Sequence, residues 1–241
     1  MWLSIALIAT SALVVGDRVA AAFAAYQIRD RVADELAAQE VEYGSLAIDV
    51  AGVPFLTQVA ARTLDEIKIS MTDLRPPAGA TGAVTIASVD VVATGLRVGI
   101  GDSLLDGPTA TAQQIVGTAF IRYATLDDLV TLPGLSLADV HFSESEGALR
   151  FEALGALAPV QAEADITVEE GLLRIQLRDA RFNSSVLPPL GRELLNQILA
   201  ATIDLSMPAL PLGLVLESVT PGPDGLSISV VGQDVPLMAG A

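Results

Sequence analysis

The sequence predicts an elongated α+β protein, with antiparallel strands, a long N-terminal helix and a second helix in the C-terminal half. Helical periodicity is confined to two stretches, whereas from Glu42 onward apolar and polar side chains mostly alternate with period two. A sheet with one dry and one wet face is typically antiparallel. No linker or low-complexity stretch divides the chain. We therefore expect one unit with about nine to twelve strands and two main helices.

Composition restricts the functions open to the chain. Its 241 residues include 13 basic and 29 acidic ones, and the net charge of −16 argues against a nucleic-acid partner. Hydrophobic residues make up 51% and aromatic residues only 4%, so small aliphatic side chains must fill the core. The absence of cysteine excludes disulfides and Cys-ligated metals, and a single histidine, His141, excludes a multi-His metal site.

The first segment, Met1–Gly16, is apolar and carries no charge. It is shorter than the ~20 residues that span a bilayer as a straight helix, and it suits the apolar region of a signal peptide. The usual basic region is missing, which leaves open an earlier start, a weak anchor or an ordinary buried helix. We expect a signal peptide or N-terminal membrane anchor over residues 1–16 and a single domain over residues 17–241.

The next segment, Asp17–Gln39, has the period of an α-helix. One apolar stripe comprises Ala21, Ala25, Ile28, Val32 and Leu36. A second stripe, nearly opposite, comprises Val19, Phe23, Tyr26 and Ala33. Because a helix that is apolar on two sides is usually buried on both, we expect this helix to be enclosed by the rest of the protein.

Strands follow this helix. Period-two alternation predicts strands around Leu46–Val50 and Ile67–Thr72, with a short helix over Phe55–Arg62 between them. Val84–Ile100 reads as a strand pair or as one bent strand, with Gly95 as a turn or bulge point. A second main helix is predicted from about Pro189 to Ile203, since proline is tolerated at its start.

Three hairpins are predicted in the second half of the chain. In the clearest, a turn at Glu170-Gly171 sets Ile166 opposite Ile175 and Glu163 opposite Arg178, which pairs apolar with apolar and acid with base. The other two hairpins have turns at Glu146-Gly147 and at Pro223-Asp224-Gly225.

Catalytic and metal-binding patterns are weak. The chain has no nucleophile elbow, P-loop, zincin or EF-hand motif. Asp102 and Asp106 lack a ligand-rich loop and are better explained by a turn, and His141 falls on the solvated side of a strand. Asn183 begins a glycosylation sequon, a tripeptide that is common by chance. We expect no enzyme activity, no cofactor and no metal.

One segment has a recognisable pattern. Val53-Pro54-Phe55-Leu56-Thr57-Gln58, followed by Arg62 and Leu64–Ile69, resembles the G-x-P-F-L-T-Q…L-x-x-V-x-V signature of the actinobacterial LmeA-like family. Looser matches occur at Gly117–Ala119 and Leu210–Leu214. The resemblance covers roughly Asp17–Leu237; it departs from the family pattern at Val53 and at Leu212, where phenylalanine is common.

The resemblance implies an exported cell-envelope protein that binds phospholipid, including the phosphatidylinositol type. It also implies a fold similar to tubular lipid-binding domains, in which an elongated, curved antiparallel sheet is wrapped around the long N-terminal helix. It further implies support of lipid-linked glycan (lipomannan-type) assembly or lipid trafficking, on the periplasmic side of the membrane. An N-terminal segment would contact the membrane. Two rival classes stay open: an envelope scaffold with a closed core and no ligand, and a hydrolase or transferase.

The residues supply a mechanism for the implied lipid binding. A sheet with one dry face, packed on a helix through small aliphatic side chains, can leave an elongated apolar cleft for acyl chains. Candidate lipid-binding residues are Pro54, Phe55, Leu56, Gln58, Arg62, Lys68, Phe23 and Ile28. Arg62 and Lys68 would meet a phosphate. Pro54, Phe55 and Leu56 would line the pocket or form a core turn, and Gln58 would face solvent or donate to a headgroup.

Overall fold

The computed structural model describes residues 2–75, 84–99, 109–127, 138–154, 159–169, 172–182, 202–206 and 214–238. Its helices are α1 (Trp2–Ala38), α2 (Phe55–Ala60) and α3 (Tyr123–Asp127). Its strands are β1 (Ser45–Ala51), β2 (Thr63–Leu74), β3 (Ile86–Gly99), β4 (Thr109–Arg122), β5 (Ala138–Ser145), β6 (Ala148–Leu154), β7 (Pro159–Glu169), β8 (Leu172–Phe182), β9 (Thr202–Ser206), β10 (Val215–Pro221) and β11 (Gly225–Met238).

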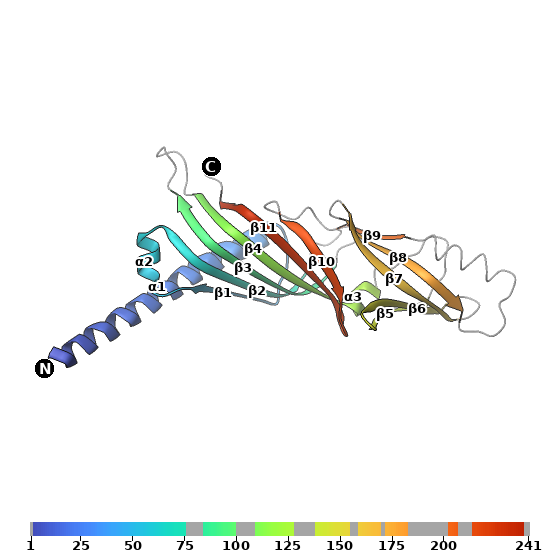
Figure 1. The fold of residues 1–241 in the computed structure, drawn as a ribbon, viewed down its shortest axis with the longest axis horizontal. Helices are drawn as coiled ribbons and strands as arrows, with labels where there is room; N and C mark the ends of the chain where they lie inside the picture. The colour runs from blue at the N-terminus through green and yellow to red at the C-terminus, as the bar shows by residue number, and fades with distance from the viewer. Residues whose placement is uncertain are drawn as a thin grey trace.

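The strands form two sheets that follow each other along the length of the molecule (Figure 1). One has six strands in the order β1-β2-β3-β4-β11-β10, and the other has five in the order β5-β6-β7-β8-β9. Every strand pair is antiparallel. The six-stranded sheet curves around α1, and its first strand, β1, lies at the open edge beside this helix. The predicted fold class is confirmed.

The predicted hairpins have the expected registers. Ile166 pairs with Ile175 and Glu163 with Arg178 across β7 and β8. The Arg178 guanidinium lies 3.8 Å from the Glu163 carboxylate. Glu170 and Gly171, the predicted turn of this hairpin, lie outside the described residues.

The other two hairpins are present as well. Glu146 and Gly147 link β5 to β6, both with positive φ as a tight two-residue turn requires. β10 pairs with β11 across the turn that Gly225 ends. In the six-stranded sheet, β3 is a single long strand, and Gly95 within it has a φ of +62°.

Helix α1 differs from the prediction in length and in environment. It is one continuous helix from Trp2, so no break separates the apolar segment Met1–Gly16 from the region that follows. Only the first predicted stripe packs on the sheet, where Ala21 is buried and Ile28 is partly buried. The second stripe is exposed: Val19 and Phe23 are each 63% accessible. The prediction that this helix is enclosed is wrong, because the sheet covers one side of it only.

The predicted second main helix is wrong at its C-terminal end. Thr202 and Ile203 belong to strand β9, where Ile203 pairs with Ile175 of β8. Two β-branched residues beside an apolar strand gain more from cross-strand pairing than from a last helical turn. The rest of the predicted helix, from Pro189, lies outside the described residues, as do Asn183, Asp102 and Asp106.

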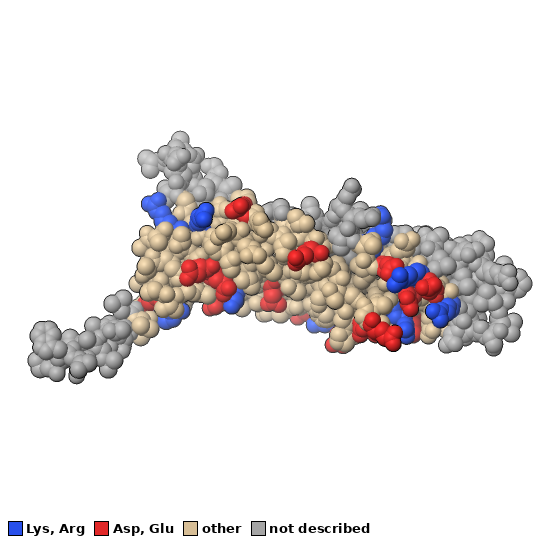
Figure 2. Space-filling model, viewed as in Figure 1, with Lys and Arg blue, Asp and Glu red and all other residues tan. Residues whose placement is uncertain are grey.

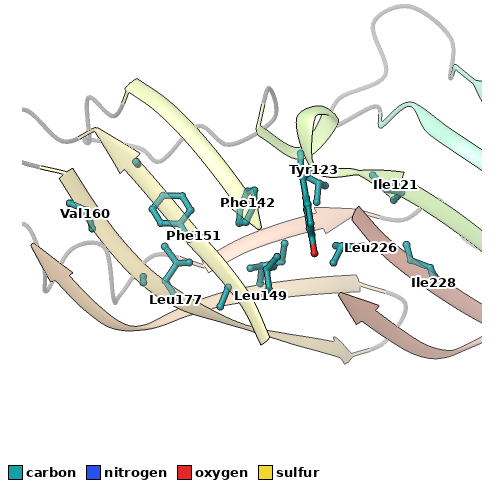
Figure 3. Packing of buried hydrophobic residues seen from close by; sticks show 14 residues of the cluster. Ile121, Tyr123, Phe142, Leu149, Phe151, Val160, Leu177, Leu226 and Ile228 are labelled. Carbon is teal, nitrogen blue, oxygen red and sulfur yellow. The ribbon is translucent and has the colours of Figure 1, made fainter. Parts of the chain in front are cut away.

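The apolar core is divided into two clusters. The first lies where the two sheets meet, and Figure 3 shows Tyr123, Phe142, Leu149 and Leu226 converging there. Phe142 and Phe151 pack edge to face with ring centres 5.5 Å apart. Tyr123 donates its hydroxyl to the carbonyl oxygen of Gly222 at 2.8 Å. Burial raises the pKa of Tyr123 to about 12, which keeps this hydroxyl a donor.

The second cluster lies at the opposite end, where α1 and α2 cover the six-stranded sheet. Its buried members are Ala21, Val50, Phe55, Ile67, Ala93, Leu96, Ala112, Ile115 and Val235. Most of the helix side is alanine, so the helix approaches the sheet closely but fills little volume. This end of the molecule therefore holds both the motif around Phe55 and the incompletely filled contact between helix and sheet.

Candidate functional site

A groove runs between one flank of α1 and the edge strand β1. It has a volume of about 510 Å3 and is lined by Arg18, Ala21, Ala22, Ala25, Tyr26, Arg29, Leu46, Ala47, Ile48, Asp49 and Val50. Its volume falls within the range of roughly 300–1,000 Å3 that is usual for small-molecule sites. Its floor is apolar and polar side chains stand at its rim. We call it the α1–β1 groove.

The helix side of the groove follows from residue spacing. Arg18, Ala22, Ala25 and Arg29 are separated by four, three and four residues, so they form one line along α1. With a rise of 1.5 Å per residue, the two arginines stand about 16 Å apart along the helix axis. The side chains between them are alanines, which occupy little volume beside β1. The groove therefore has small apolar side chains along its helix side and an arginine toward each end of this line.

The two arginines differ in their surroundings. Arg18 lies 3.1 Å from the Asp17 carboxylate and donates to the carbonyl oxygen of Gly52 at 2.6 Å. Arg29 is exposed and forms no ion pair with any residue that the structure describes. Among the lining residues Asp49 is the single acidic one. Arg29 is therefore the cation best placed to meet an anionic group at the groove.

Asp17 fixes the end of the groove by holding α2 against α1. The residue is only 3% exposed, and its side chain accepts a hydrogen bond from the backbone N–H of Leu56 at 2.8 Å. Helix α2 begins after Pro54, which offers no capping side chain, so Asp17 supplies the cap from another helix. The N–H groups of Leu56 and Phe55, with Arg18 beside them, hold the pKa of Asp17 below its ordinary value.

We expect the variant Asp17→Asn, which can still accept the hydrogen bond but has no negative charge, to lower the melting temperature by roughly 2–4 °C at neutral pH, since a carboxylate at a helix N-terminus interacts favourably with the helix dipole and losing this interaction has an effect of that size in such a domain. A lowered pKa stabilises the fold above the ordinary value of 3.8, and this contribution is lost as the pH falls through the lowered pKa. The melting temperatures of the unmodified protein and of the variant should therefore differ at neutral pH and become equal at acidic pH. The control Asp34→Asn, at an exposed position of α1, should melt at the same temperature as the unmodified protein at both pH values.

The structure brings together two of the candidate residues proposed from the sequence. Phe55 is buried in the second core cluster, and Ile28 packs against the same cluster. Pro54, which follows a cis peptide bond, and Leu56 are exposed beside it. The sequence left two alternatives for this segment, a pocket lining and a core turn. In the structure Phe55 is a core residue and Leu56 is a surface residue.

Gln58 is buried within this corner rather than on the helix surface. Its Oε1 accepts from the backbone N–H of Asp65 at 2.8 Å, which joins α2 to β2. Its Nε2 is buried without a hydrogen-bond partner among the described residues. This amide occupies the space where Gly52, with φ of +110°, would carry a Cβ atom, so a side chain at Gly52 would displace it. The motif from Gly52 to Gln58 is thus a packed corner.

The remaining candidates lie apart from one another. Arg62 is exposed at the end of α2, with φ of +57°. Lys68 is on the face of β2 opposite the buried Ile67 and lies 3.0 Å from Glu66, which with Asp49 raises the pKa of this lysine. Phe23 is exposed on the outer side of α1. None of the eight candidate residues lines the α1–β1 groove.

Sequence reasoning missed the lining residues, although a signal for them was present. Neither Arg18 nor Arg29 is among the predicted site residues, although their line with Ala22 and Ala25 has helical spacing. Apolar stripes were sought for the core, whereas the groove lies on the flank between the buried and the exposed stripe of α1. Two arginines with alanines between them along one line of a helix form the pattern that points to the groove.

The fold and the groove define a class of protein: a curved sheet packed on a long helix, with an apolar channel between basic side chains, suited to an amphiphilic ligand. Comparison with protein families identifies the class further, because the LmeA-like phospholipid-binding family matches residues 15–231. The chain belongs to this family. Neither the curated proteins nor the solved structures contain a significant match. Within the described residues, no helix combines the length and the apolar character that crossing a membrane requires.

Proposed function

We propose that the protein binds one phospholipid with its acyl part in the α1–β1 groove and its phosphate against Arg29 or Arg18. The observation that carries this proposal is the groove itself, with an apolar floor and a cation at each end. Family membership supports phospholipid as the ligand class. It also favours binding over the alternative of an envelope scaffold that holds no ligand.

The energetics favour acyl chains over water in this groove. Burial of each methylene contributes ~0.8 kcal/mol, so even part of one chain gives several kcal/mol. The net charge of −16 opposes an anionic ligand, but this repulsion is weakened at the groove, where two arginines stand against one aspartate. The phosphate then gains a charge-assisted hydrogen bond from a guanidinium.

The wider role that we propose is non-catalytic and takes place in the cell envelope after export. There the protein would support lipid-linked glycan (lipomannan-type) assembly or lipid trafficking, with a phosphatidylinositol-type headgroup as one ligand and the N-terminal segment in contact with the membrane. The resemblance of the Pro54–Gln58 segment to envelope lipid-binding proteins supports this setting. In the described part of the chain no group of three His, Cys, Asp or Glu side chains is arranged to hold a metal ion.

Native mass spectrometry of the gently purified full chain tests the proposal. We expect a species heavier than the apo protein by the mass of one phospholipid. The variant Arg29→Gln should lose lipid, with affinity reduced roughly 10- to 100-fold, because a hydrogen bond to a charged group is worth about 1.5–3 kcal/mol. The control Arg75→Gln removes an exposed arginine that pairs with Glu42 outside the groove and should keep the lipid. A purely apo mass for the unmodified chain contradicts the proposal.

A further inference from the structure

We propose that one end of the molecule docks on the surface of a phospholipid bilayer. The docking surface, called here the end surface, consists of Val14, Val15 and Val19 of α1 and Val53, Leu56 and Val59 at α2. This proposal rests on the proposed function, because a lipid-binding groove needs access to membrane lipid. The end surface is nevertheless separate from the groove and has its own residues.

The exposed apolar side chains are strongly clustered. Ten large hydrophobic residues are exposed in the described part of the chain, and eight of them lie within residues 14–26 and 53–59. Val53 is 72% accessible and Val15 is 62% accessible. Single exposed apolar residues are normal, whereas a concentration of them at one end of a molecule marks a contact surface. This end of the protein is therefore built to meet an apolar environment.

Two hydrogen bonds hold the two segments of the end surface together. Asp17 accepts from the N–H of Leu56 at 2.8 Å, and Arg18 donates to the carbonyl oxygen of Gly52 at 2.6 Å. Figure 1 shows α2 beside α1 at the end from which the N-terminal part of α1 projects beyond the sheet. Residues 1–16, which include Val14 and Val15, carry no charged side chain. Helix and corner thus present apolar groups at the same end.

Charge distinguishes a bilayer from other apolar partners. In the two segments 14–28 and 52–62 the sole acidic residue is Asp17, which is buried, whereas Arg18 and Arg62 are exposed. One further carboxylate, that of the exposed Asp65 in β2, lies beside Gly52. The rest of this protein of net charge −16 is acidic, and Figure 2 shows Asp and Glu side chains spread along both sheets. Apolar side chains flanked by arginine match the acyl–headgroup boundary of a bilayer, where phosphates lie.

The end surface also adjoins the α1–β1 groove. Arg18 lines the groove and at the same time contacts Gly52, the residue before Val53. Val50, at the near end of the groove, is three residues from Val53 in the chain. With the end surface on a bilayer, the mouth of the groove would lie at headgroup level. A lipid could then pass between bilayer and groove without crossing water.

The absence of native cysteine permits a direct test on the full chain. Single cysteines at Val53, Leu56 and, as control, Val215 of β10 are labelled with an environment-sensitive fluorophore. The control site is 63% accessible and lies in β10, at the edge of the six-stranded sheet opposite β1. On vesicles of phosphatidylcholine and phosphatidylglycerol, the labels at 53 and 56 should shift to shorter wavelength and be quenched by nitroxide lipids. The label at 215 should not respond.

Two double variants that introduce aspartate test the affinity for vesicles. Val53→Asp with Leu56→Asp should weaken vesicle binding at least tenfold, while Val116→Asp with Val215→Asp, also at exposed valines, should leave it within twofold. Labels at 53 and 56 that stay as hydrated as the label at 215 overturn the proposal. So does shielding of these labels at high protein concentration without vesicles, which would indicate a second copy of the chain.

The two lipid sites can fail separately. If native mass spectrometry shows retained phospholipid while the labels at 53 and 56 stay hydrated, bilayer docking by the end surface is contradicted and lipid binding in the α1–β1 groove stands. If the protein has an apo mass while the labels are buried in the bilayer, lipid binding in the groove is contradicted and bilayer docking by the end surface stands.

Discussion

Replacing Phe55 by alanine is expected to lower the free energy of unfolding by about 3–5 kcal/mol, the usual cost of truncating a buried aromatic residue. Phe55 is 5% exposed and belongs to the cluster that joins α1, α2 and the six-stranded sheet. Its loss leaves a cavity that the alanine-rich surface of α1 has no side chains to fill. Chemical denaturation followed by circular dichroism measures the change.

The adjacent residue provides the matched control. Leu56 belongs to the same helix but is 46% exposed, so Leu56→Ala should change the free energy of unfolding by less than about 1 kcal/mol. Equal losses for the two variants would show that the buried assignment of Phe55 is wrong. A charged residue at Phe55, an apparent probe of lipid contact, would test folding instead.

Filling the groove is expected to remove bound lipid without unfolding the protein. Ala22 is an exposed residue in the middle of the Arg18–Arg29 line, and the variant Ala22→Trp places an indole ring within the groove of about 510 Å3. A ring that buries ~150–250 Å2 competes directly with an acyl chain. We expect lipid content, measured by native mass spectrometry or by extraction, to fall at least tenfold.

The control for this variant is Ala37→Trp, on the same helix, exposed and outside the groove lining. It carries the same change in helix propensity and surface hydrophobicity. Both variants should melt within a few degrees of the unmodified protein. If Ala22→Trp keeps its full complement of lipid, the acyl chains occupy another part of the molecule.

Local patterns in the sequence predicted most of the fold. Period-two alternation gave the strands, and opposite charges at Glu163 and Arg178 gave the register of β7 with β8, because these signals depend on neighbours across one short turn. Local patterns could not predict that one side of α1 is left exposed. Whether a second sheet layer covers Val19 and Phe23 depends on where distant strands end, which no periodicity within the helix records.

The site was predicted less well than the fold. The motif from Val53 to Gln58 was recognised, but its residues build the corner that supports the groove. Asp17 caps α2 from a position 39 residues earlier in the chain. Such a contact needs the three-dimensional arrangement, since an aspartate after an apolar run looks the same whether it faces water or a helix N-terminus. The groove itself arises from small residues, and absent volume leaves a weak trace in sequence.

Strands β4 and β11 have a consequence for how the molecule opens. Each supplies residues to both apolar clusters: Ile115 and Ile121 come from β4, and Val235 and Leu226 come from β11. Neither half can come apart without breaking hydrogen bonds that the other half depends on. Their central amides should therefore exchange with solvent deuterium most slowly, while β1 at the sheet margin exchanges early. Local opening that starts at β1 would let the groove widen for an incoming tail without global unfolding.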